Sequence, residues 1–173
     1  MLHIPFTVVT IDGIDESYPE NLPLEEVSEY ISNKKAEEFL KRIGDDELII
    51  TADTVVICDG KILGKPKDHE EAVEMLRFLA GKTHEVTTGV TVATKTQKES
   101  FTSVTYVTFS NLSDREIKYY VDTFHPFDKA GAYGIQEWIG AVAVEKIEGS
   151  YFNVMGLPVQ RLYNALKKFE PVI

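Results

Sequence analysis

The stretch that most constrains the fold is Leu48–Ile57, an apolar run with the sequence LIITADTVVI. Its length and its β-branched residues predict a buried strand. Asp53 interrupts the run in its middle. An ionised carboxylate is costly to bury unless it is paired, hydrogen-bonded or bound to a metal. Asp53 is therefore predicted to be either a structural acid that accepts hydrogen bonds from backbone amides or a residue that takes part in chemistry.

The composition indicates a globular protein that binds neither membranes nor nucleic-acid polymers. The chain has 173 residues, of which 43% are hydrophobic, so it can bury a sizeable core. No stretch reaches the roughly 20 apolar residues that span a bilayer, and the first residues do not resemble a signal peptide, which predicts a cytoplasmic location. The net charge of −10 argues against a nucleic-acid backbone, although a few lysines and a divalent cation can still hold a small phosphorylated ligand.

Strand and helix signals alternate irregularly along the chain. Runs rich in β-branched residues predict further strands at Phe6–Ile11, Lys61–Leu63, Val86–Thr94, Phe101–Phe109 and Ala141–Ile147. Helical periodicity and capping signals predict helices over Leu24–Arg42, from Asp68 to a stop at Gly81, from Ser113 to about Thr123, and after Pro158.

These elements predict an α/β or mixed α+β fold with a mixed sheet centred on the Asp53 strand. Asp59-Gly60 is a hairpin turn signal. We find no linker, so residues 1–173 are predicted to form a single domain, with the long hairpin and the following helix forming a lobe around residues 86–124. The only cysteine is Cys58, which excludes an internal disulfide.

Reactive side chains gather where the regular structure is interrupted. They lie in Asp15-Glu16, in Asp53-Thr54 with Gly64–Lys67, in Thr83-His84, and in Lys129–Gln136. Carboxylates hold a hard cation and orient water, lysines neutralise phosphate oxygens, and glycines let backbone amides approach an anion. The mixture favours a metal-assisted reaction on a phosphate.

Each of these residues also has a simpler interpretation. Lys65 and Lys67 are typical solvated loop lysines when taken alone, and Asp15 and Glu16 are typical turn residues. His84 is predicted to be a packed or solvated histidine rather than a catalyst, because its neighbours in the sequence suggest no partner. The residues alone leave the enzymatic and the structural interpretations open.

Taken together and in order, these segments resemble the Maf family of nucleotide pyrophosphatases. The matching residues are Asp15-Glu16-Ser17, Ala52–Val56, Asp59-Gly60 with Leu63–Pro66, Thr83–Val86 with Thr88–Val90, Asp128–Gln136, and Tyr151–Val154 with Gly156–Pro158. They extend over almost the whole chain, in the order and at the spacings that the family shows.

The resemblance implies an enzyme that cleaves a nucleoside triphosphate between its α and β phosphates with the help of Mg²⁺ or Mn²⁺. Asp53 matches the family's proton acceptor. Glu16 and Lys65 match residues around the phosphates and the metal, and Glu16 and Asp53 are the predicted metal ligands. Lys67 and Lys129 complete the set of predicted phosphate contacts.

The resemblance also implies a substrate and a fold. Thr54 and Gln136 match the positions at which the family distinguishes bases, and their surroundings look like the branch that acts on dTTP and UTP. The implied role is clearance of these or modified pyrimidine nucleotides from the cell. The implied fold is Maf/ITPase-like: elongated, with a bent mixed sheet, flanking helices and a cleft between two lobes, often in a cytoplasmic homodimer.

One part of the family pattern is not in this sequence. Family members usually begin with a strand, a Ser-x-Ser-Pro-Arg-Arg-like phosphate loop and a helix, all before the point that matches Leu2–Phe6. The four arginines of this chain stand elsewhere, at Arg42, Arg77, Arg115 and Arg161. An arginine pair binds phosphate strongly. A protein that truly lacks this loop, rather than one whose given sequence starts after it, would favour the alternative of a non-catalytic nucleotide-binding or cell-division regulatory protein.

Overall fold

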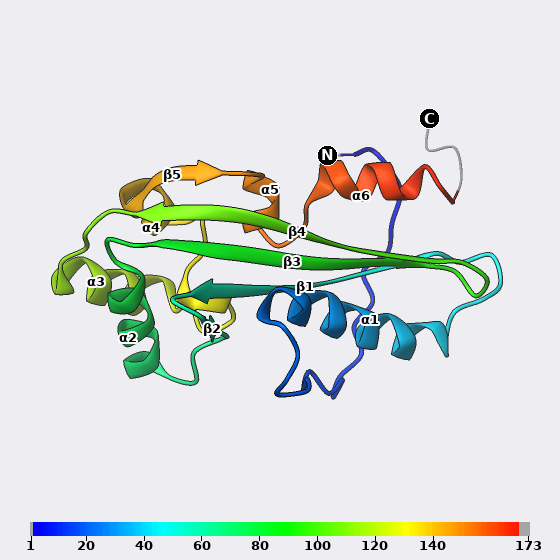
Figure 1. The fold of residues 1–173 in the computed structure, drawn as a ribbon, viewed down its shortest axis with the longest axis horizontal. Coiled ribbons are helices and arrows are strands. Elements are labelled where there is room, and N and C mark those ends of the chain that lie inside the picture. The colour runs from blue at the N-terminus through cyan, green and yellow to red at the C-terminus, as the bar shows by residue number, and fades with distance from the viewer. Residues whose placement is uncertain (1, 170–173) are drawn as a thin grey trace.

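The computed structural model describes residues 2–169, which are organised around one five-stranded sheet (Figure 1). The strands follow the order β2-β1-β3-β4-β5, with bounds β1 Ile49–Cys58, β2 Lys61–Leu63, β3 Thr83–Ala93, β4 Lys98–Phe109 and β5 Val144–Glu148. Every pairing between these strands is antiparallel. Tight turns join β1 to β2 and β3 to β4, which makes these two pairs hairpins. The α/β class is confirmed, but the predicted mixture of parallel and antiparallel strands is wrong for residues 2–169.

Helices flank the sheet on both faces and give the molecule an elongated shape (Figure 1). Their bounds are α1 Val27–Leu40, α2 His69–Leu79, α3 Asp114–Phe124, α4 Trp138–Ala143, α5 Tyr151–Val154 and α6 Val159–Leu166, with 3₁₀ turns η1 at Leu24–Glu26 and η2 at Ala130–Ala132. None of the helices within residues 2–169 combines the length and the apolar character that crossing a membrane requires.

The faces of β1 are covered by different parts of the chain. Val55 and Ile57 belong to a buried cluster with Val27 and Ile31 of α1. Val56 points the other way, since side chains alternate along a strand, and it belongs to the largest cluster, which includes residues of α2, α3 and α4. Further along that second face, α6 packs on β3. The Asp53 strand is therefore covered on both sides, as its apolar sequence predicts.

Two of the predicted strands differ in the structure. Phe6–Ile11 forms no strand, and the side chains of Phe6 and Val8 are 83% and 77% exposed. A β-rich segment becomes a strand only where a sheet edge supplies its backbone hydrogen bonds, and this segment has no such pairing in the described chain. The strand predicted over Ala141–Ile147 begins only at Val144, because the alanines before it, strong helix formers, belong to the end of α4.

The predicted helix starts are confirmed by their hydrogen bonds. The Ser113 hydroxyl accepts from the Glu116 backbone N–H, and the Glu116 carboxylate accepts from the Ser113 N–H, which completes a capping box at α3. At α2, Asp68 accepts from the Glu71 N–H, whereas the Glu71 carboxylate reaches one residue further back, to the Lys67 N–H. Both helices therefore begin where the sequence predicts.

Candidate active site

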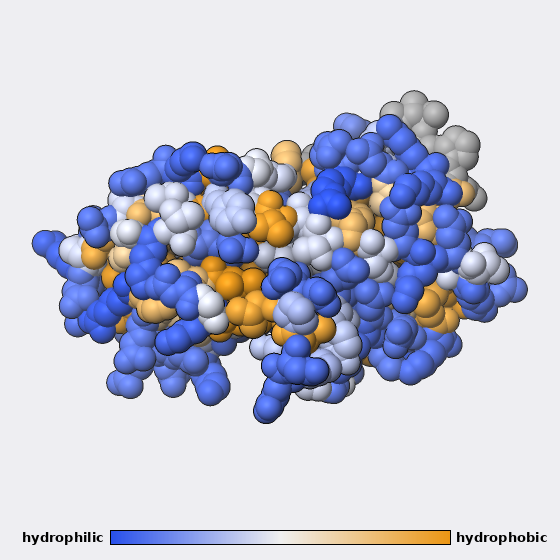
Figure 2. All heavy atoms as spheres, in the orientation of Figure 1, coloured by the Kyte–Doolittle hydropathy of each residue, from blue (hydrophilic) through white to orange (hydrophobic). Residues whose placement is uncertain are grey.

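A cleft of about 680 Å³ wraps around the edge of β1 at the centre of the sheet. β3 pairs with β1 from Ile49 to Ile57, whereas β2 covers the other edge only at Val56–Cys58, so the stretch around Asp53 borders the cleft. Figure 2 shows apolar atoms at the surface near the centre of the molecule, between two ends that are mostly hydrophilic. Six of the seven predicted site residues line the cleft: Glu16, Asp53, Thr54, Lys65, Lys129 and Gln136.

The charged part of the cleft is organised by a lysine of α1. The Lys35 ammonium lies 2.7 Å from Oδ1 of Asp53 and 2.8 Å from Oε1 of Glu16, so it bridges the two carboxylates. The side chains of Asp53 and Lys35 are only 14% and 19% exposed. This pairing supplies the partner that a carboxylate in an apolar strand requires, yet it leaves Asp53 at the wall of an open cleft.

The ionisation of these groups follows from their partners. Burial raises the pKa of Asp53, and the Lys35 ammonium offsets only part of that effect. The hydrogen bond from Lys35 lowers the pKa of Glu16. Burial alone would lower the pKa of Lys35, but the two carboxylates raise it above its usual value, so the ammonium stays charged. A carboxylate with a raised pKa is a better proton acceptor than an ordinary aspartate.

Close packing of α1 on the sheet fixes the position of Lys35. The Ser32 hydroxyl, one turn before Lys35, donates to the Thr51 carbonyl at 3.0 Å, and the Thr51 hydroxyl donates to the Ser32 carbonyl at 2.8 Å. A Cβ atom added to Gly89 of β3 would lie 2.2 Å from the backbone nitrogen of Glu29. Only glycine allows α1 to approach this closely, and Lys35 reaches Asp53 as a result.

The other part of the cleft is neutral. Thr54 points to the face of β1 opposite Asp53, and its hydroxyl oxygen lies 2.9 Å from that of Thr88 on β3. Gln136 is exposed at the rim, and the segment Val154–Gly156 after α5 forms the adjoining wall. The cleft therefore joins a charged pole to a pole of neutral polar and apolar groups.

Backbone hydrogen bonds hold the loop that carries Lys129 and Gln136. The Gly131 N–H donates to the Gly64 carbonyl at 3.0 Å, which ties this loop to the one bearing Lys65. The buried Tyr120 of α3 accepts from the Gly134 N–H at 3.0 Å and donates to the Glu137 carboxylate. Glu137 also lies 3.3 Å from the Lys129 ammonium, whose second partner is Asp128 at 2.7 Å. The two lysine-bearing loops are thus joined next to the cleft.

Some residues lie elsewhere than their sequence position suggests. Lys67 is exposed and does not line the cleft. His84 is packed, as predicted: it is 1% exposed, its Nε2 lies 2.8 Å from the Tyr133 hydroxyl, and burial lowers its pKa to about 4. Sequence reasoning missed Lys35. The one feature of the sequence that points to Lys35 is its position four residues after Ile31, which places it on the buried face of α1.

The carboxylates of the cleft could hold a divalent cation only together with other ligands. Within residues 2–169, no group of three or more Asp, Glu, His or Cys side chains converges on one point. Glu16 and Asp53 nevertheless direct two carboxylate oxygens at a single cation, the Lys35 ammonium. Mg²⁺ is usually held by one or two carboxylates together with substrate phosphates and water. The donor set therefore fits a cation that enters with the substrate, rather than one held by protein ligands alone.

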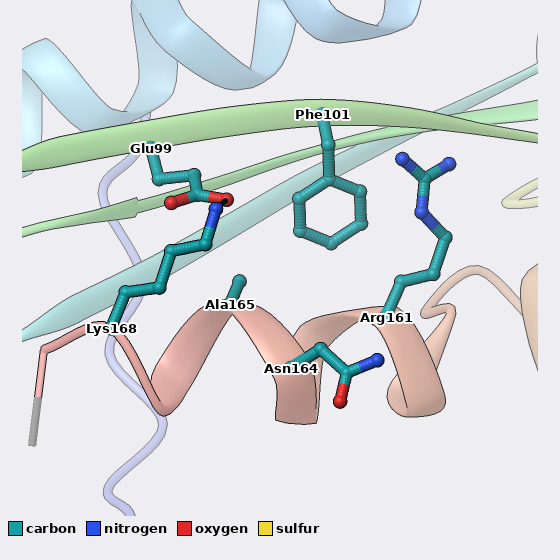
Figure 3. Close-up of a pocket in the computed structure, with 6 residues that line it drawn as sticks. All are labelled: Glu99, Phe101, Arg161, Asn164, Ala165 and Lys168. Carbon is teal, nitrogen blue, oxygen red and sulfur yellow. Dashed lines mark hydrogen bonds and ion pairs between the residues drawn. The ribbon is translucent and has the colours of Figure 1, made fainter.

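A second hollow, of about 160 Å³, lies between α6 and β4 (Figure 3). Its charged groups already have partners in the protein. Arg161 lies over the Phe101 ring at 4.8 Å, and Lys168 pairs with Glu99 at 2.5 Å. Compared with the cleft at β1, this hollow is smaller, and only one carboxylate, Glu99, lines it.

The chain is similar in sequence to proteins of known family. The family profile described as Maf-like protein matches residues 1–169. A protein of Bacteroides thetaiotaomicron named dTTP/UTP pyrophosphatase is 53% identical over 167 residues, which cover 96% of this chain and 86% of that protein. Proteins of the same name from Porphyromonas gingivalis W83 and Christiangramia forsetii are 51% and 47% identical, over 97% and 96% of this chain and 85% of each relative.

Proposed function

Because the chain belongs to the Maf family, we propose that it hydrolyses UTP and dTTP to the nucleoside monophosphate and pyrophosphate. The observation that carries the proposal is Asp53, a largely buried carboxylate paired with Lys35 at the wall of a nucleotide-sized cleft. The names of three relatives at 47% to 53% identity support the same substrates.

In the proposed reaction, Asp53 accepts a proton from a water molecule that attacks the α phosphorus. The bond from this phosphorus to the oxygen that bridges to the β phosphorus breaks, and pyrophosphate leaves. Lys35 and Lys65 line the cleft near Asp53, where their positive charge stabilises the negative charge that develops on the phosphates. Lys129 extends this positive surface along the joined loops.

We further propose that Glu16 and Asp53 hold a divalent cation, Mg²⁺ or Mn²⁺, together with the substrate. Such an ion would neutralise phosphate charge and favour departure of pyrophosphate. Lys35 keeps the two carboxylates ionised and close together while no nucleotide is bound.

In the cell, the proposed activity would clear UTP, dTTP or modified pyrimidine nucleotides from the nucleotide pool. The neutral pole around Thr54 and Gln136 supports recognition of a base rather than of phosphate alone. The homodimer, the cytoplasmic location and the single domain over residues 1–173 that the sequence suggests stay predictions.

Pyrophosphate release from UTP, dTTP, CTP, ATP and GTP in the presence of Mg²⁺ tests the proposal. We expect UTP and dTTP to be the preferred substrates. Asp53→Asn should lower kcat by a factor of about 10² or more, because general-base catalysis contributes on this order. Its far-UV circular dichroism should match that of the wild type.

Asp59→Asn is the matched control, since it makes the same chemical change at an exposed turn position after β1, where asparagine tolerates the positive φ of 49°. We expect this variant to keep wild-type activity. An Asp53→Asn protein that releases pyrophosphate at the wild-type rate would rule out the proposed base. Nucleotide binding by the wild type without any release of pyrophosphate would favour a non-catalytic binding protein.

A further inference from the structure

The hydroxyl of Thr54 belongs to a chain of hydrogen bonds that begins at the neutral pole of the cleft. Thr54 of β1 and Thr88 of β3 face each other in the sheet, and their hydroxyl oxygens are 2.9 Å apart. The Thr88 hydroxyl also lies 3.2 Å from the backbone carbonyl of Asn153 in α5. Thr54 lines the cleft, whereas Thr88 and Asn153 are fully buried.

The direction of these hydrogen bonds follows from counting protons. A carbonyl only accepts, so Thr88 is the donor in its bond to Asn153. A hydroxyl carries one proton, and Thr88 therefore has none left for Thr54. The bond between the two hydroxyls must then run from Thr54 to Thr88. The Thr54 oxygen consequently presents only lone pairs to the cleft.

The acceptor at the end of this chain is itself fixed. The Asn153 amide nitrogen donates to the Val86 carbonyl at 2.9 Å and to the Thr105 hydroxyl at 3.0 Å, and the Asn153 N–H is capped by Ser150. Asn153 therefore cannot turn its carbonyl away from Thr88 without breaking several buried hydrogen bonds, each of which is costly to lose. The orientation of the Thr54 proton is set by the fold.

We propose that Thr88 is a specificity-determining residue that makes Thr54 a fixed hydrogen-bond acceptor for the N3–H group of a uracil or thymine base. This inference rests on the proposed pyrophosphatase function. Uracil and thymine share an N3–H donor, whereas cytosine carries an unprotonated N3 that only accepts. A fixed acceptor facing N3 therefore attracts the first two bases and repels the third.

Gln136 alone cannot make this distinction. Its amide has a donor end and an acceptor end, and rotation by half a turn exchanges them. Gln136 is also exposed at the rim of the cleft. It can contact either kind of pyrimidine edge, so the polarity of recognition must come from a group that cannot rotate. Thr54, held by Thr88, is such a group in the wall of the cleft.

The first test uses the unaltered protein. Its kcat/KM for UTP is compared with that for 3-methyl-UTP, which lacks the N3–H donor, and with that for CTP. We expect both analogues to be at least about tenfold poorer substrates, since one lost hydrogen bond corresponds to roughly this factor. Equal use of 3-methyl-UTP and UTP would overturn the proposal.

The second test frees the Thr54 hydroxyl. Thr88→Val preserves the side-chain shape but removes the acceptor, so the Thr54 proton can turn toward the cleft and donate to N3 of cytosine. We expect the UTP-to-CTP ratio of kcat/KM to fall about tenfold. Thr88→Ser, which keeps a hydroxyl at this position, should show the wild-type UTP-to-CTP ratio of kcat/KM. In a Thr54→Val background, Thr88→Val should change it no further, because the two residues act through one bond.

Thr87→Val is the matched control. Thr87 is equally buried on β3 but faces the other side of the sheet, and its hydroxyl has no hydrogen-bond partner among the described residues. Its UTP-to-CTP ratio should stay at the wild-type value. An unchanged ratio in Thr88→Val, with the wild type active on UTP, would overturn this inference alone. A wild type that releases no pyrophosphate from any pyrimidine triphosphate would overturn the proposed function instead.

Discussion

At the scale of single residues, the bridge between Asp53, Lys35 and Glu16 explains how an acid is accommodated in the most apolar strand of the chain. Burial raises the pKa of Asp53, and the adjacent Lys35 ammonium counteracts it. The net effect is a carboxylate with a raised pKa, which is more basic than an exposed aspartate. In the proposed mechanism, Lys35 would thus influence the pH below which Asp53 no longer accepts a proton.

Replacing Lys35 by methionine should shift the pH dependence of kcat/KM. A general base must be deprotonated, so activity is lost as the pH falls through the pKa of Asp53. Removing the ammonium removes a charge that favours the carboxylate, so this pKa rises further and the acidic limb moves to higher pH. The measurement is kcat/KM for UTP from about pH 5 to about pH 9, since the pH dependence of kcat/KM reports the pKa of the base in the free enzyme.

Lys41→Met is the control, because Lys41 lies just after α1 and pairs with the exposed Glu38 rather than with the cleft. Its acidic limb should coincide with that of the wild type. A Lys35→Met limb that stays in place, or moves to lower pH, would mean that Asp53 is not the titrating base.

At the scale of elements, the site depends on how closely α1 approaches β3. Gly89 lies opposite Asp53 in the sheet, and the backbone of Ser28 and Glu29 packs directly over it. The hydrogen bonds between Ser32 and Thr51 fasten the same helix one turn before Lys35. The position of the charged pole is thus a consequence of helix packing.

Gly89→Ala should destabilise the protein and weaken its activity together. The new methyl group would overlap the α1 backbone, and an overpacked core costs about 1–3 kcal/mol in the free energy of unfolding. The helix must move away, which displaces Lys35 from Asp53. Urea unfolding and pyrophosphate release measure the two effects.

Gly64→Ala is the control for stability, since a Cβ atom there meets nothing within 4 Å. Equal unfolding midpoints for Gly89→Ala and the wild type would refute the close packing.

Local signals predicted most elements because the responsible interactions lie within a few residues. The capping residues at Asp68 and Ser113 and the turn at Asp59-Gly60 are of this kind. Phe6–Ile11 was predicted wrongly because strand formation depends on a distant sheet edge, which composition does not reveal. Lys35 was missed for a similar reason: its partners are 18 and 19 residues away in the sequence.

At the scale of the whole molecule, the cleft is assembled from segments that are far apart in the sequence and cover both faces of the sheet. The charged pole combines Glu16, α1 and the Lys65 loop, and the neutral pole combines Gln136 with Val154–Gly156. The order of the motifs along the chain predicted six of the residues that meet there. It did not predict that β1 separates Asp53 from Thr54 by turning them to opposite faces.

This arrangement predicts that a nucleotide orders both poles at once. A UTP analogue with a non-hydrolysable α,β bridge, bound with Mg²⁺, should slow amide hydrogen exchange in residues 16–18, 129–136 and 154–156. It should also stabilise the protein by about 2.7 kcal/mol at a hundredfold excess over its Kd.

Inorganic tripolyphosphate is the matched control ligand, since it offers the charges of the nucleotide without the nucleoside. It should protect residues 16–18 and the part of the loop around Lys129 but leave 154–156 unchanged, because the segment after α5 lies at the neutral pole. Equal protection of residues 154–156 by both ligands would show that this segment responds to phosphate, and the base would then have to bind elsewhere.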